Sequence, residues 1–199
     1  MIFQDLNNID LKNIPVIIFG SGPAGITTSL GLEKKKIQSL IIEAGSETYN
    51  KTSQDFYRGK VTGDHLTDIS LSRLRQLGGT SGHWGGWSKP MENYSFDSWP
   101  IKAKDLEGYT DRTCKILGIK NQFNQSKLNN YFNQIQFQYS NVRFAKKYKK
   151  HIKNSKYIHL VLNTQLSHFE GENKVVTNAV CISRNLTKKI QSKYFILSC

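Results

Sequence analysis

The segment from Val16 to Gly45 constrains the fold of this chain more than any other part of the sequence. A short apolar run, Val16 to Phe19, leads into three glycines in G-x-G-x-x-G spacing, and a helical stretch follows. A second apolar run, Leu40 to Ile42, ends at Glu43. This order of strand, glycine-rich turn, helix, strand and acid is typical of a βαβ unit that binds a dinucleotide, whereas an ordinary strand–turn–helix has no reason for the acid.

The residues of the turn have distinct physical roles. Gly20 permits a tight turn, Gly22 lets a pyrophosphate approach the backbone, and Gly25 lets the helix pack closely on the strand. Pro23 suits the first helical turn, where its missing N–H is not needed, and the helix N-terminus offers partial positive charge to phosphates. We therefore expect the following residues at a diphosphate: Gly20, Ser21, Gly22, Pro23, Ala24 and Gly25.

Glu43 is placed to accept hydrogen bonds from both hydroxyls of an unphosphorylated ribose. A 2′-phosphate would be repelled by this carboxylate, so FAD or NAD is favoured over NADP.

Composition limits the compartment and the partners. No run approaches the length that spans a bilayer, and no apolar segment before Ile14 suggests a secretory signal. The three cysteines are widely spaced and form no C-x-x-C pair, which favours neither a zinc site nor disulfides, and we expect a cytoplasmic protein. The net charge of +13 is compatible with a nucleic-acid or membrane partner, but also with a merely lysine-rich composition, and no recognition motif accompanies it.

The rest of the chain divides by pattern. Apolar residues at helical spacing predict a helix over 103–118 that ends at Gly118, and a second helix over 128–139. The last third predicts a small antiparallel meander that begins with the apolar run Ile158 to Leu162, and its last strand, Tyr194 to Ser198, re-enters a parallel sheet. The expected organisation is a polar arm at 1–14, a βαβ unit at 15–45, an excursion and loop at 46–100, helices at 101–140 and the meander at 155–199.

A second glycine-rich stretch, residues 77–90, reads LGGTSGHWGGWSKP. Glycine pairs on both sides of T-S-G-H-W let the backbone pass close to a flat or anionic ligand. Thr80 and Ser81 add hydroxyl donors, and Arg73 and Arg75 lie upstream, where they can neutralise phosphate charge. We expect the two glycine-bearing turns to close around one ligand.

These segments resemble the glucose–methanol–choline (GMC) family of FAD-dependent oxidoreductases. Three blocks carry the resemblance: Gly20 to Gly45, Arg73 to Gly86 (RLRQLGGTSGHWGG) and Phe96 to Tyr109 (FDSWPIKAKDLEGY). It implies an α/β fold, with 15–199 an incomplete Rossmann-type FAD-binding domain that has a parallel sheet and a small antiparallel meander. It also implies that these residues contact FAD: Ala44, Arg75, Gly79, Thr80, Ser81, His83, Trp84, Gly85 and Leu166, the last through its backbone at the adenine.

The T-S-G-H-W sequence is most similar to that of pyranose-oxidase-like and gluconate-dehydrogenase-like members. In pyranose oxidases the histidine of the similar segment is joined covalently to the flavin, which implies that His83 lies beside the flavin ring and is its attachment point. The alternative is a histidine that packs or hydrogen-bonds within the loop. Trp84 and Trp87 are expected to cover the site or anchor the loop rather than to stack on the ligand.

Members of this family are far longer, and their catalytic histidine lies near the C-terminus. This sequence stops at Cys199, no histidine in it matches that base, and the substrate domain is largely absent, so we expect a truncated, split or fragmentary frame. The resemblance implies the FAD-binding part of an enzyme that oxidises CH–OH groups of a sugar or polyol by hydride transfer to flavin. We assign no catalytic residue and no metal ligand.

Three alternatives stay open. One is a non-catalytic flavin- or nucleotide-binding module that needs a partner chain, another is an NAD-dependent Rossmann enzyme, and the last is a basic nucleic-acid binder. The Gly78 to Gly86 loop separates the first from the second, because a simple NAD domain has no use for it.

Overall fold

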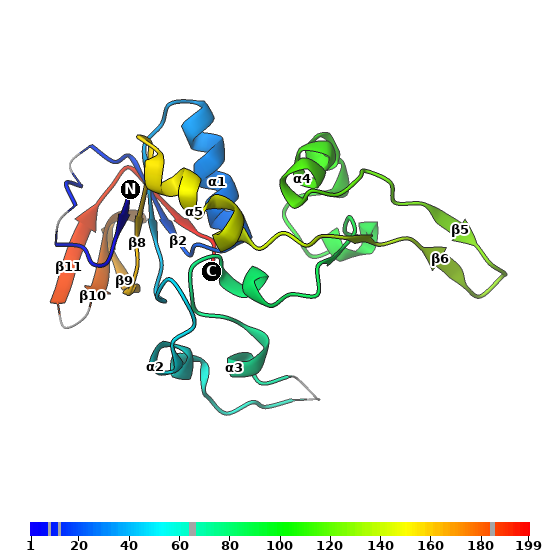
Figure 1. Cartoon of the computed structure of the whole chain (residues 1–199), viewed down its shortest axis with the longest axis horizontal. Coiled ribbons are helices and arrows are strands. Elements are labelled where there is room, and N and C mark those ends of the chain that lie inside the picture. Colours follow the sequence, from blue (N-terminus) through cyan, green and yellow to red (C-terminus); the bar gives the residue numbers. More distant parts are fainter. Residues whose placement is uncertain (8, 12, 64–66, 184–185) are drawn as a thin grey trace. The chain divides into compact units, whose positions relative to one another are not determined.

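The structure, a computed structural model, describes residues 1–7, 9–11, 13–63, 67–183 and 186–199 (Figure 1). The chain forms two compact units. The first consists of Met1–Trp84 and Arg143–Cys199, and the second of Gly85–Val142. Each unit is described by itself.

A five-stranded parallel sheet in the order β1-β8-β3-β2-β12 is the centre of the first unit. Its two strands from the βαβ unit are apolar apart from Ser39 and are buried along their whole length, as expected for a parallel sheet covered on both faces. The strand bounds are β1 Ile2–Phe3, β2 Val16–Phe19, β3 Ser39–Ile42, β8 Ile158–Val161 and β12 Tyr194–Leu197.

Two helices and a second sheet cover this parallel sheet. Helix α1 (Pro23–Lys34) contacts β2 and β3, and α5 (Phe144–Asn154) contacts β8 and α1. A three-stranded antiparallel sheet consists of β9 (Thr164–Glu172), β10 (Val175–Ser183) and β11 (Leu186–Gln191). Its inward residues join alternate residues of β2 and β3 in one core: Ile17, Phe19, Leu40, Ile42, Ala179, Cys181 and Ile190. Because side chains of a strand alternate between its faces, the helices cover the opposite face.

The fold class is confirmed, and the meander does lead into a strand parallel to β2, where Tyr194 pairs with Val16. The prediction that the meander begins with the apolar run at 158–162 was wrong, however. Residues Ile158–Val161 form β8, which lies between β3 and β1 in the parallel sheet. The reason is that this short run is buried almost throughout and follows a helix, which is the arrangement of a parallel crossover.

The described parts of residues 1–14 do not form the expected polar arm. Ile2 and Phe3 pair with β8 as an edge strand, and Leu6, Ile9 and Ile14 are buried in the core. The sequence did not indicate this burial, because the spacing of these apolar residues among acids and amides matches neither a helix nor an alternating strand.

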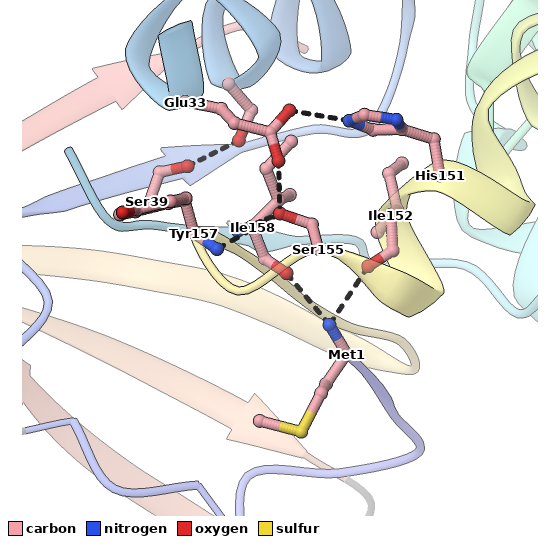
Figure 2. Close-up of polar contacts among 9 residues, drawn as sticks. Met1, Glu33, Ser39, His151, Ile152, Ser155, Tyr157 and Ile158 are labelled. Atoms are coloured by element: carbon pink, nitrogen blue, oxygen red, sulfur yellow. Dashed lines mark hydrogen bonds and ion pairs between the residues drawn. The ribbon is translucent and has the colours of Figure 1, made fainter. Parts of the chain in front are cut away.

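Polar contacts fasten α1, α5 and the start of β8 to one another (Figure 2). The Glu33 carboxylate accepts from the Ser155 hydroxyl at 2.5 Å and lies 2.5 Å from His151 Nε2. The Met1 amino group donates to the carbonyl oxygens of Ile152 and Ile158 at 3.0 and 2.9 Å. Burial by itself would raise the pKa of Glu33, but hydrogen bonds from Ser155 and His151, with the charge of His151, lower it overall.

This contact predicts an acid-dependent loss of stability. A carboxylate whose pKa is lowered by folding stabilises the fold above its unfolded pKa, and this contribution disappears as the pH falls through the folded pKa. We expect Glu33→Gln to lower the free energy of unfolding by about 1 kcal/mol at neutral pH. Measured by urea denaturation, the free energy of unfolding of this variant should decline less steeply than that of the wild type between about pH 6 and about pH 3. Glu172→Gln, at an exposed position, is the control. Parallel declines of the wild type and Glu33→Gln would contradict the assignment.

The described parts of the segment between β3 and the second glycine turn, 43–63 and 67–76, contain only short helices and turns, and residues 64–66 of the expected excursion lie outside the described residues. The segment contains α2 (Lys51–Gln54), a 3-10 turn (Asp55–Tyr57) and α3 (Ile69–Ser72), and the second glycine turn itself contains a further 3-10 turn (Gly79–Gly82). Within the described parts of the chain, no helix combines the length and the apolar character needed to cross a bilayer.

The second unit contains one regular helix rather than two. Helix α4 (Thr110–Leu117) ends at Gly118, whose φ of 64° is the expected left-handed C-cap. The helix predicted over 128–139 was wrong, because an exposed hairpin with a turn at Asn129 occupies that region. The other elements are β4 Trp87–Ser88, β5 Gln125–Lys127, β6 Asn133–Ile135, β7 Gln138–Tyr139 and 3-10 turns at Asn93–Phe96, Ala103–Asp105 and Glu107–Tyr109.

Candidate dinucleotide-binding site

The first glycine turn is built by close backbone packing. Gly20 has a φ of +100°, which other residues rarely adopt, and a Cβ there would lie 2.9 Å from the carbonyl oxygen of Ser198. A Cβ on Gly25 would lie 2.0 Å from the carbonyl oxygen of Gly20. Helix α1 therefore reaches its place on β2 only with glycine at both positions.

Gly22 differs from its two neighbours because the space beside it is open. It is the N-cap of α1, and a Cβ there would meet no atom within 4 Å. Among the described residues no side chain caps this helix end, and Pro23 occupies its first turn. An uncapped helix N-terminus beside open space fits a diphosphate group.

Glu43 is buried, with 6% of its surface exposed, and it already holds several hydrogen bonds. One carboxylate oxygen accepts from the Gly45 amide at 2.7 Å, and the other accepts from the Ser21 amide and hydroxyl at 3.0 and 2.5 Å. A carboxylate offers about four acceptor positions. The structure therefore leaves room for one further donor, whereas we expected Glu43 to accept from both ribose hydroxyls.

The second glycine turn lies directly against the first. The Gly78 amide donates to the carbonyl oxygen of Ser21 at 3.1 Å and to its hydroxyl at 3.2 Å. A Cβ on Gly79 would lie 3.2 Å from Cα of Gly22. Gly78 and Gly79 both have positive φ, at 81° and 54°, so this sharp turn requires glycine. The structure thus brings the two turns together.

The hydroxyl groups of the second turn bond within the protein. Ser81 has 1% of its surface exposed, donates to the carbonyl oxygen of Gly78 at 2.6 Å and accepts from the Phe144 amide at 3.1 Å. The Thr80 hydroxyl accepts from the Leu74 amide at 3.2 Å. Ser81 thus fastens the turn to α5, and Thr80 fastens it to the segment that precedes it.

The remaining residues of the loop have different surroundings. His83 is exposed, and Trp84 is half-buried, with its ring centroid 6.3 Å from that of Phe144 in an edge contact. The Trp84 ring thus packs against the first residue of α5. Gly85 and Trp87 belong to the second unit, where Trp87 contacts Tyr139.

An open pocket of about 490 Å³ lies beyond the end of β3, and the charged side chain of Arg75 lines it. The guanidinium donates to the Ser53 hydroxyl at 2.7 Å and to Gln165 Oε1 at 2.8 Å, and it lies 4.4 Å above the Phe56 ring. Burial lowers the pKa of Arg75, although the charges of Glu43 and Tyr57 oppose this shift. Ala44 lines the same pocket, and Leu166 follows Gln165 in β9, partly buried against the core.

Sequence reasoning missed the residue that places Arg75. Gln54 is buried, and its side-chain amide donates to the carbonyl oxygens of Ser70 and Arg73 at 2.8 and 2.6 Å. Its side-chain oxygen accepts from the Arg75 amide at 3.0 Å. No motif marks Gln54, because its partners come from a later part of the chain.

A second and more apolar pocket of about 470 Å³ lies within the second unit. Its walls come from the segments around β4 and α4, and none of the expected site residues lines it.

Comparison with known proteins identifies the fold. A pyridoxine 4-oxidase from Mesorbium loti superposes with a TM-score of 0.58 at 13% identity, over 93% of this chain and 49% of the other. An FAD-dependent oxidoreductase from Chaetomium thermophilum gives a TM-score of 0.64 at 12% identity, over 94% of this chain and 45% of the other. The chain therefore has the fold of about half of an FAD-dependent oxidoreductase. No protein-family model matches the sequence, and no curated protein is significantly similar to it.

Proposed function

We propose that this chain binds FAD and is the flavin-binding part of a GMC-type oxidoreductase. The observation that carries the proposal is the direct contact between the two glycine turns, in which the Gly78 amide bonds to Ser21. Two turns that both require glycine, beside an uncapped helix end and a buried acid, form a cradle that suits a dinucleotide. The likeness to FAD-dependent oxidoreductases favours FAD over NAD.

Each end of the cofactor has residues of matching chemistry. The diphosphate would lie at Gly22 and the start of α1, and a ribose hydroxyl would donate to Glu43. The pocket that contains Arg75 would take the adenosine end, with the backbone of Leu166 nearby. The exposed His83 would lie near the flavin ring and is proposed as its covalent attachment point.

The reaction belongs to the intact enzyme rather than to this chain alone. Bound flavin supplies the hydride acceptor for oxidation of a CH–OH group, for which we propose a sugar or polyol as donor. The chain spans about half the length of the solved structures that it matches, so the remaining part of such an enzyme would supply the substrate site and the base.

A titration tests the proposal directly. We expect added FAD to bind the purified chain with quenching of flavin fluorescence, and to bind at least tenfold more tightly than NAD or NADP. Protein that leaves FAD fluorescence unchanged, or that prefers NADP, would refute the proposal. Flavin that remains with the protein after acid denaturation would support the bond to His83, and complete release would exclude it.

A further inference from the structure

A line of buried hydrogen bonds, joined at the backbone of Gly78, connects the end of β3 to the start of α5 through both glycine turns. The Ser21 hydroxyl donates to Glu43 and accepts from the Gly78 amide. The Ser81 hydroxyl donates to the Gly78 carbonyl oxygen and accepts from the Phe144 amide. Every donor along this line points toward the Glu43 carboxylate.

Burial makes these bonds consequential. Ser21 is fully buried, and Ser81, Phe144 and Glu43 are 1%, 1% and 6% exposed. A buried polar group that loses its hydrogen-bond partner is strongly unfavourable. The second turn is therefore held by partners within the protein before any ligand arrives.

We propose that Ser21 is a positioning residue that couples the Glu43 carboxylate to the second glycine turn and so presets the cofactor cradle. Its hydroxyl does not reach the space beside Gly22, because it is buried between Glu43 and Gly78. The Ser21 amide is likewise committed to Glu43. Ser21 thus acts on a ligand through the glycine turn, whereas the sequence motif alone placed it among the diphosphate contacts.

A second buried serine provides a matched control for Ser21. Ser29 of α1 is also fully buried, and its hydroxyl bonds to that of Ser39. This bond does not involve either glycine turn. Loss of the Ser29 hydroxyl therefore reports the general effect of removing a buried hydroxyl from this part of the fold.

The experiment compares Ser21→Ala with Ser29→Ala in the full chain. Hydrogen–deuterium exchange of the peptide that covers residues 77–84, in protein without added flavin, reads the order of the second turn directly. We expect Ser21→Ala to raise this exchange at least tenfold and Ser29→Ala to leave it unchanged. Equal exchange in Ser21→Ala and the wild type, or equal acceleration in both variants, would overturn the proposal.

A second variant keeps the test decisive if Ser21→Ala does not fold. Glu43→Gln removes the charge toward which the donors point but retains the shape of the side chain. This variant should also accelerate hydrogen–deuterium exchange of the peptide that covers residues 77–84. FAD affinity is a separate readout that rests on the proposed function, and it should fall at least tenfold in Ser21→Ala. Faster exchange in a protein that never binds FAD would support the role of Ser21 and refute the cofactor assignment.

Discussion

Gly22→Ala is expected to weaken FAD binding at least tenfold, and Gly22→Val to abolish it, while the fold is retained. The open space beside Gly22 accepts a methyl group without any protein contact within 4 Å, and its φ of −69° suits any residue. A diphosphate that approaches the same backbone would meet that methyl group. A tenfold loss corresponds to about 1.4 kcal/mol of binding free energy.

The measurement for Gly22 is a fluorescence titration with FAD, accompanied by urea denaturation of each variant. Gly59→Ala is the matched control, because Gly59 also has open space around its Cβ position and lies outside both glycine turns. Unfolding midpoints should agree among the wild type and all variants. Unchanged FAD affinity in Gly22→Val would place the cofactor elsewhere.

Gly25→Ala is expected to destabilise the fold severely. Alanine in place of a helical glycine normally gains about 1 kcal/mol from helix propensity. Here the new Cβ would lie 2.0 Å from the Gly20 carbonyl oxygen and 2.7 Å from the Ser198 hydroxyl. Because the first of these atoms is backbone, α1 must move away from β2, and overpacking of this kind costs about 3 kcal/mol.

Urea denaturation of Gly25→Ala distinguishes the gain in helix propensity from the steric clash, because the first raises the free energy of unfolding and the second lowers it. Gly22→Ala is the control at the start of the same helix, where the Cβ position is open. A net loss of about 2 kcal/mol or more is expected for Gly25→Ala, since the clash exceeds the gain in propensity. Equal or higher stability would show that α1 does not pack as closely on β2 as the structure has it.

The βαβ unit was predictable because its requirements are local. Gly20 is needed for its positive φ and Gly25 for its close approach to the Gly20 carbonyl oxygen, and β2, α1 and β3 lie where the spacing of the motif indicated. The wrong helix over 128–139 shows the limit of this approach. A second helix was expected there, but Tyr131 and Phe132 are exposed in the hairpin.

The inner architecture of the site was not predictable, because it depends on partners that are distant in the chain. Ser21, Gly78 and Phe144 meet only after three separate segments have packed together. Gln54 likewise gains its role from Arg73 and Arg75. Motif spacing identifies which residues border a dinucleotide, but it does not separate those that face the ligand from those that hold the turn.

The pairing of β2 with β12 has a consequence for how this polypeptide matures. Val16 is synthesised well before its partner Tyr194, because α1, β3 and the whole antiparallel sheet lie between them in the chain. One edge of β2 therefore stays unpaired until β12 has been synthesised. Such sequence-distant pairing slows folding and exposes nascent chains to aggregation, so production of this protein should depend on chaperones and improve at low temperature.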